Sequence, residues 1–116
     1  MLVKPNQMRV EKREKMRDGN GTVILEHFFP KENLPSKTRL AARIILEKGV
    51  SIGSHTHSNE SEIYYCIQGS GKVIDGDGIE QALNVGDATL TCHGGTHYLE
   101  GTSVEPCIIV AIVTLD

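Results

Sequence analysis

The chain has no tryptophan, and aromatic residues make up only 4% of its 116 residues. Its core must therefore be built mainly from Val, Ile, Leu and Ala. A domain of this length buries roughly 65% of its unfolded surface, so it can fold without disulfide bonds. The three cysteines, Cys66, Cys92 and Cys107, are far apart and form no Cys-x-x-Cys pattern of a metal or redox site. We therefore expect reduced thiols and a cytoplasmic protein.

The sequence also lacks long apolar runs and an excess of positive charge. No stretch approaches the roughly 20 apolar residues that span a bilayer, and the N-terminal segment has no apolar stretch long enough for a signal peptide. A net charge of −3 provides no general attraction to nucleic acid or anionic lipid. The most basic segment, residues 9–17 (RVEKREKMR), is predicted to be a solvated helix or arm, with contact to nucleic acid as the weaker alternative. We expect neither nucleic-acid nor membrane partners.

What the chain does contain is a series of short strand-like segments separated by polar turns. Residues 38–47 show this best, because apolar residues alternate with Arg39, Arg43 and Glu47 in the period of a half-buried strand. The sequence DGDG at 75–78 fits a hairpin turn better than a calcium loop. The segments predicted as strands are 22–29, 38–47, 63–68, 72–75, 79–83, 88–92, 96–100 and 107–114.

Regularly spaced short strands predict an all-β sandwich or barrel. We divide the chain into an N-terminal arm or strand, residues 1–21, and one barrel domain, residues 22–116. No internal repeat and no linker interrupts the domain.

Four residues form a candidate metal site. His55 and His57 are two positions apart, so on an extended segment both imidazoles leave the same face. Glu62 follows a polar, turn-like run that can bring its carboxylate back beside them, and His97 follows a pair of glycines. Three imidazoles and one carboxylate suit a divalent transition metal (Mn, Fe, Co, Ni, Cu or Zn) rather than Mg or Ca. The alternative for His55 and His57 alone is a pair of surface histidines.

Several neighbouring residues have open or ordinary interpretations. Glu60 is a rival to Glu62, but spacing favours Glu62 and predicts a solvated loop carboxylate at position 60. Tyr64 shares a strand face with Glu62 and should point into the domain, either as a catalytic or substrate-binding hydroxyl or as a packed core residue. Cys66 is expected to fill the core and Cys92 to lie in a loop. His27 and His93 are expected at the surface, and Arg43 either binds an anionic substrate or faces solvent.

These residues resemble the cupin family. The pattern Gly49-x5-His55-x-His57-x4-Glu62-x6-Gly69 matches the first cupin motif at every fixed position. Residues 86–101 match the second motif in spacing, with Gly94 and His97 in their places. Cys92 stands where proline is usual, and Gly101 where asparagine is usual.

The resemblance implies a double-stranded β-helix, or jelly-roll barrel, of six to eight strands. One divalent metal (Mn, Fe, Ni, Zn or Co) would lie inside it on His55, His57, Glu62 and His97, and the protein would be a homodimer. An arginine that oxalate-type cupins carry three residues before the first histidine is replaced by Ile52.

The function implied is a metalloenzyme of dioxygenase, decarboxylase, isomerase or lyase type, acting on a small oxygen-rich or carboxylate substrate. The alternative is a non-catalytic sensor or carrier that holds a small ligand on its metal. Cupin sensors normally carry a DNA-binding domain, for which this chain has no room, and this favours the enzyme. An empty structural barrel is disfavoured because buried imidazoles and a carboxylate are costly without an ion.

Overall fold

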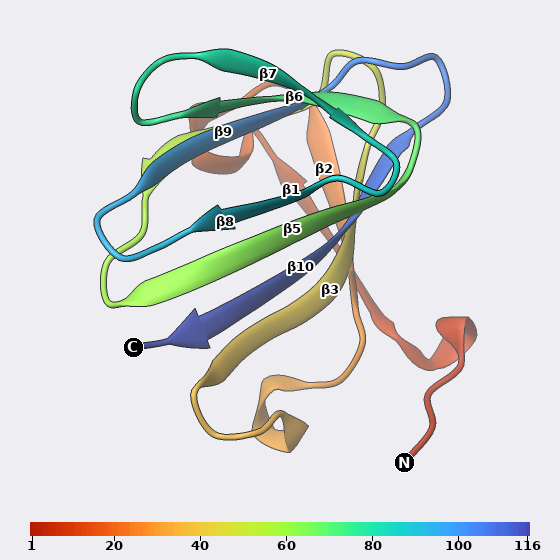
Figure 1. Ribbon diagram of the computed structural model, residues 1–116. Coiled ribbons are helices and arrows are strands. Elements are labelled where there is room, and N and C mark those ends of the chain that lie inside the picture. Colours follow the sequence, from red (N-terminus) through yellow and green to blue (C-terminus); the bar gives the residue numbers. More distant parts are fainter.

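The computed structural model describes residues 1–116, which fold into two antiparallel β-sheets that face each other (Figure 1). One sheet has the strand order β1-β2-β3-β10-β5-β8, and the other has the order β4-β9-β6-β7. The strands are β1 (Arg9–Glu14), β2 (Thr22–His27), β3 (Thr38–Leu46), β4 (Ser51–Thr56), β5 (Glu60–Gln68), β6 (Ser70–Asp75), β7 (Glu80–Asn84), β8 (Ala88–Thr91), β9 (Thr96–Gly101) and β10 (Cys107–Leu115). Three short 3-10 turns, η1 (Pro5–Gln7), η2 (Met16–Asp18) and η3 (Lys31–Asn33), lie in the N-terminal third. The predicted jelly roll is confirmed, with ten strands instead of the six to eight expected.

The core lies between the two sheets because the central strands alternate in hydrophobicity. Along β10, every second residue from Cys107 to Val113 is buried. Its neighbours β3 and β5 contribute buried side chains in the same way, and β5 places Glu62, Tyr64 and Cys66 on its inner face. The predicted facing of the residues on β5 is therefore confirmed.

The N-terminal segment was predicted as an arm or strand, and it contains a strand. Residues 9–17 were predicted as a solvated helix or arm, but residues 9–14 form β1, which pairs with β2 from Arg9 opposite His27 to Glu14 opposite Thr22. β1 is an edge strand with almost no buried side chain. Its backbone hydrogen bonds and charged side chains hold it in place, so no apolar alternation marks it in the sequence.

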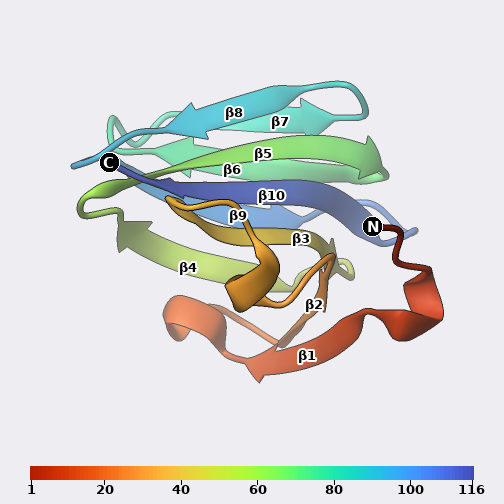
Figure 2. The same ribbon diagram turned by 90° about the horizontal axis from the view of Figure 1, so that it is seen from below.

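The chain then turns at η2 and packs against β4, as the underside view shows (Figure 2). Two glycines allow this close approach. A Cβ atom on Gly53 would overlap the carbonyl oxygen of Arg17, and one on Gly19 would overlap the carbonyl oxygen of Ser51. The turn at η2 is therefore held directly beside the strand that carries His55. No helix in the structure has the length and apolarity to span a membrane.

Candidate metal centre

Both sheets contribute to the cluster of His55, His57, Glu62 and His97. His55 lies on β4 directly opposite His97 on β9, and Glu62 comes from β5 in the other sheet. His57 follows the end of β4. Its amide donates to the carbonyl of Gly95 at 3.0 Å, and its own carbonyl accepts from the amide of Gly94 at 2.7 Å. The loops of the two sequence motifs are thus hydrogen-bonded to each other, which is why residues 40 positions apart meet.

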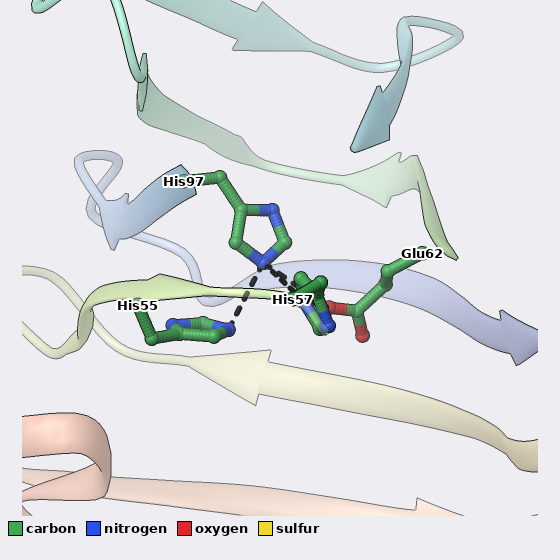
Figure 3. A group of neighbouring side chains, drawn as sticks. All are labelled: His55, His57, Glu62 and His97. Carbon is green, nitrogen blue, oxygen red and sulfur yellow. Dashed lines mark hydrogen bonds and ion pairs between the residues drawn. The ribbon is translucent and has the colours of Figure 1, made fainter. Parts of the chain in front are cut away.

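The side chains converge on one point (Figure 3). Nε2 of His97 lies 2.9 Å from Nε2 of His57 and 3.0 Å from Nε2 of His55. Oε1 of Glu62 lies 3.0 Å from Nε2 of His57 and 3.2 Å from Nε2 of His97. One ligand atom from each of the four residues lies within 4.8 Å of the others. All of these side chains are buried except His55, which is partly exposed.

The second nitrogen of each ring is already engaged. Nδ1–H of His55 donates to the carbonyl of Gly53 at 2.8 Å, and Nδ1–H of His57 donates to Oε1 of Glu60 at 2.8 Å. Nδ1 of His97 is hydrogen-bonded to the hydroxyl of Thr91 at 3.0 Å. Such contacts fix the tautomer and orientation of metal-binding histidines. Neutral His55 and His57 therefore direct an unprotonated Nε2 into the cluster.

This arrangement suits a cation. While the rings are neutral, at most one proton, on Nε2 of His97, is available to four converging acceptor atoms. Two ligand atoms about 2.1 Å from a metal, and at right angles, lie about 3.0 Å apart. The separations of 2.9, 3.0, 3.0 and 3.2 Å in the cluster are close to that value. The donor set and its spacing therefore fit one transition-metal ion.

Glu60 is not the solvated loop carboxylate that the spacing predicted. β5 begins at Glu60 rather than at residue 63, and the side chain of Glu60 is only 13% exposed. Besides accepting from His57, it receives two hydrogen bonds from Arg39 at 2.7 and 3.0 Å. These Arg39 bonds, and to a smaller extent the His57 contact, lower the pKa of Glu60 to about 2. An ionised Glu60 thus orients the ring of His57.

The sequence offered a signal for this role that the spacing argument missed. Glu60 follows His57 by three residues across a tight turn in which Asn59 has a φ of 58°. That turn brings the carboxylate back to the ring.

Tyr64 lies beside the cluster. Its ring stacks on that of His97 with 4.9 Å between centroids and 13° between planes. Burial, followed by the charge and hydrogen bonding of Glu62, raises the pKa of Tyr64 well above its usual range. Its hydroxyl is therefore protonated at neutral pH. Burial is also the main cause that lowers the pKa of His55, and this favours the neutral ring that a metal requires.

A cavity of about 50 Å³ opens beside the cluster. His55, His57, Glu62 and Tyr64 line its inner wall. Arg13, Arg17 and Arg39 line its rim. Pockets for drug-sized ligands measure about 300–1,000 Å³, so this one accepts a ligand of only a few heavy atoms. The arginine rim was not predicted from the sequence. Arg13 and Arg17 lie in the N-terminal segment, whereas Arg39 lies on β3, 22 positions after Arg17.

The other singled-out residues lie away from the cluster. His27 is buried on β2 and bound to Oε1 of Glu11 at 2.8 Å, so its predicted surface position is wrong. His93 is exposed in a loop, as predicted, and accepts the amide of Asn59. Arg43 binds Oε1 of Glu26 at 2.6 Å and does not line the cavity. The structure also confirms a buried Cys66 and an exposed Cys92.

Fold and site together define a class: a jelly roll of two sheets with a cluster of three histidines and a glutamate that can hold a metal ion in its interior. Family comparison agrees. The chain matches the cupin domain over residues 42–113, more than half of its length, and therefore belongs to the cupin family.

Two relatives from Thermotoga maritima cover almost the whole chain. At 35% identity over 115 residues, the chain is similar to a protein named oxalate-binding protein, with 99% of this chain and 94% of the relative covered. A crystal structure described as a predicted oxalate decarboxylase has a TM-score of 0.93 at 34% identity and covers 100% of both chains. KdgF from a Halomonas species has a TM-score of 0.81 at 15% identity, covers 100% of this chain and 94% of its own, and shows the fold alone.

Proposed function

We propose that the protein binds one divalent transition metal through His55, His57, Glu62 and His97, and holds a small carboxylate ligand of the oxalate class on that metal. The observation that carries the proposal is the convergence of three oriented imidazole nitrogens and a carboxylate at about 3 Å, beside a cavity with an arginine rim. The similarity to an oxalate-binding protein supports the choice of ligand class.

The metal would supply a Lewis-acidic centre for the oxygen atoms of the ligand. The chain's own residues would do the rest. The Gly53 carbonyl, Glu60 and Thr91 keep the three rings oriented. The small cavity excludes larger acids, and Tyr64 presents a protonated hydroxyl in its wall.

Elemental analysis of protein purified without a histidine tag, alongside His57→Ala, tests the metal site. We expect about one ion per wild-type chain and loss of that ion in the variant. Calorimetric titration of oxalate into the metal-loaded protein then tests the ligand class. Wild-type protein that stays free of Mn, Fe, Co, Ni and Zn even after reconstitution would contradict the proposal.

A second candidate function is catalysis of the dioxygenase, decarboxylase, isomerase or lyase type. The observation that favours it is the Tyr64 hydroxyl, which is protonated and lies in the cavity wall beside Glu62. Such a group can donate a proton or a hydrogen bond to a reacting oxygen. Turnover of small carboxylates, diketones and phenols by wild-type protein, with loss of turnover but retention of metal in Tyr64→Phe, would support this candidate. Binding without turnover would leave the carrier or sensor role.

We also propose that the protein is a homodimer that pairs through the outer face of the six-stranded sheet. On β5 the outward side chains Ile63, Tyr65 and Ile67 are 45%, 45% and 39% exposed, and Leu90 on the adjacent β8 is 63% exposed. Contiguous exposed apolar groups of this kind mark interaction surfaces. Sedimentation equilibrium should give twice the chain mass, and Ile63→Glu should give the monomer.

The free cysteines also support a cytoplasmic location.

A further inference from the structure

One arginine in the rim of the cavity has no partner in the structure. Of the five arginines in the chain, four form ion pairs with glutamates. These pairs are Arg9–Glu11, Arg13–Glu11, Arg39–Glu60 and Arg43–Glu26. Arg17 forms neither an ion pair nor a side-chain hydrogen bond, although it lines the same cavity as Arg13 and Arg39. Those two neighbours are paired with glutamates, Arg13 sharing Glu11 with Arg9, whereas Arg17 is available to a ligand.

The backbone of Arg17 is held in place rather than free. Lys15, Arg17 and Asp18 all have positive φ angles, at 50°, 55° and 63°. Non-glycine residues rarely adopt this conformation unless the surroundings impose it. The amide of Lys15 donates to the carbonyl of Gly21 at 2.8 Å, and the amide of Gly19 donates to the carbonyl of Met16 at 3.0 Å. The turn is thus closed on itself.

The turn is also pressed onto the strand that carries the first metal-site histidine. The carbonyl of Arg17 contacts Gly53 so closely that no side chain fits there, and Gly53 is two residues from His55. Arg17 also lines the cavity whose wall includes His55, His57 and Glu62. After burial and the neighbouring histidines, the charge of Arg17 is a further cause that lowers the pKa of His55, and it opposes the rise in the pKa of Tyr64.

We propose that Arg17 binds the carboxylate oxygens of the ligand that face away from the metal, and so selects small dicarboxylates over singly charged acids of the same shape. A planar guanidinium matches a carboxylate with two parallel hydrogen bonds, which makes the contact both strong and directional. This inference rests on the proposed function, because it assumes that a carboxylate occupies the metal beside the cavity. It identifies Arg17 as the residue that recognises the second carboxylate of the ligand.

The test compares two ligands that differ at one position. Oxalate and oxamate have nearly the same shape, but oxamate carries a neutral amide where oxalate has its second carboxylate. Calorimetric titration of the metal-loaded full chain with each ligand gives two dissociation constants. For the wild-type protein we expect oxalate to bind more tightly. In Arg17→Ala, oxalate affinity should fall by about 10- to 100-fold and the preference over oxamate should largely disappear.

Two further variants keep the test specific. Arg17→Lys retains the charge without the paired hydrogen-bond geometry, and it should recover part of the preference. Lys12→Ala removes a positive charge from the adjacent β1, where Lys12 lines a separate groove on the outer face. It should leave both affinities unchanged. Metal content and melting temperature of each variant show whether the site and the fold are intact.

The outcomes separate this inference from the proposed function. Loss of the oxalate preference in Arg17→Ala, with metal retained, supports the role of Arg17. An unchanged preference in Arg17→Ala, or an equal fall with both ligands, would overturn that role while leaving the carboxylate site standing. Failure of loaded wild-type protein to bind either ligand would overturn both.

Discussion

The inner face of β5 has two ends that are both buried at β5 itself but chemically opposite. The metal end consists of His55, His57, Glu62 and His97. The thiol end consists of Cys66, Leu83, Leu99 and Cys107. Glu62 at one end is 5% exposed and Cys66 at the other is 0% exposed, although only four residues, roughly 13 Å of strand, separate them.

The two ends show that burial alone does not say what a position is for. At the thiol end, removing apolar side chains from water stabilises the fold directly. At the metal end, burying three imidazoles and a carboxylate opposes folding unless a cation or hydrogen bonds compensate. The first end therefore contributes stability in any state of the protein, whereas the second contributes most when an ion is bound. Substitutions at each end should reveal that difference.

The largest effect is expected at the metal end. His57→Ala should abolish stoichiometric metal binding, because it removes a ligand at the centre of the cluster. Adding Mn²⁺, Co²⁺ or Zn²⁺ at 100 times its Kd should stabilise the wild-type protein by about 2.7 kcal/mol and raise its Tm by roughly 10 °C. The Tm of His57→Ala should not respond. Thermal melts with and without metal measure both.

His27→Ala is the matched control for that experiment. It removes a buried histidine whose partner is Glu11 and which is not part of the cluster. Its Tm should rise with metal as the wild-type Tm does. A metal response in His57→Ala equal to that of the control would contradict the assignment of the metal end.

A substitution that creates a cavity at the thiol end should lower stability but leave metal affinity nearly unchanged. Leu99→Ala removes a fully buried side chain on β9 and should lower the free energy of unfolding by about 2–5 kcal/mol. Metal affinity should change little, because the altered side chain points to the thiol end. Urea unfolding of the metal-free protein gives the stability, and metal titration gives the affinity. A large loss of metal affinity would show that the two ends are coupled.

A smaller effect is expected from the carboxylate that orients His57. Glu60→Gln keeps the size of the side chain but weakens the charge-assisted hydrogen bond to Nδ1 and the contact with Arg39. Metal affinity should fall by about 10-fold, at the lower end of what such changes cost. Metal stoichiometry should remain one per chain. Competition with a chelator measures the affinity. A complete loss of metal would instead make Glu60 a ligand.

The mildest test uses the thiols themselves. Burial raises the pKa of Cys107 to about 12 and also raises that of Cys66. Cys107 therefore stays protonated at pH 8, the raised pKa of Cys66 disfavours its reactive thiolate, and both side chains are out of contact with solvent. Iodoacetamide at pH 8 should therefore label only the exposed Cys92 in the folded chain and all three cysteines in urea. Mass spectrometry counts the labels, and labelling of Cys107 without unfolding would show that the thiol end opens.

Much of this fold follows from patterns in the chain. The period-two segments correctly placed β3 and β10, because each has a buried face that apolar residues must occupy. β1 did not follow, because an edge strand stabilised by backbone hydrogen bonds and charges carries no apolar alternation. β5 was predicted too short for a related reason, since its first residues are polar and serve the metal end.

The candidate site divides in the same way. The spacing of His55, His57, Glu62 and His97 is a local property of two motifs, and the sequence by itself determined that these four would meet. The ionised state of Glu60 and the roles of Arg39 and Arg17 depend on contacts between segments far apart in the chain. Glu60 needs Arg39 from β3, and Arg17 needs a glycine on β4 to lie against. Only the tertiary structure decided these, because a side chain's charge is readable in a sequence but its partner, or lack of one, exists only once the strands are packed.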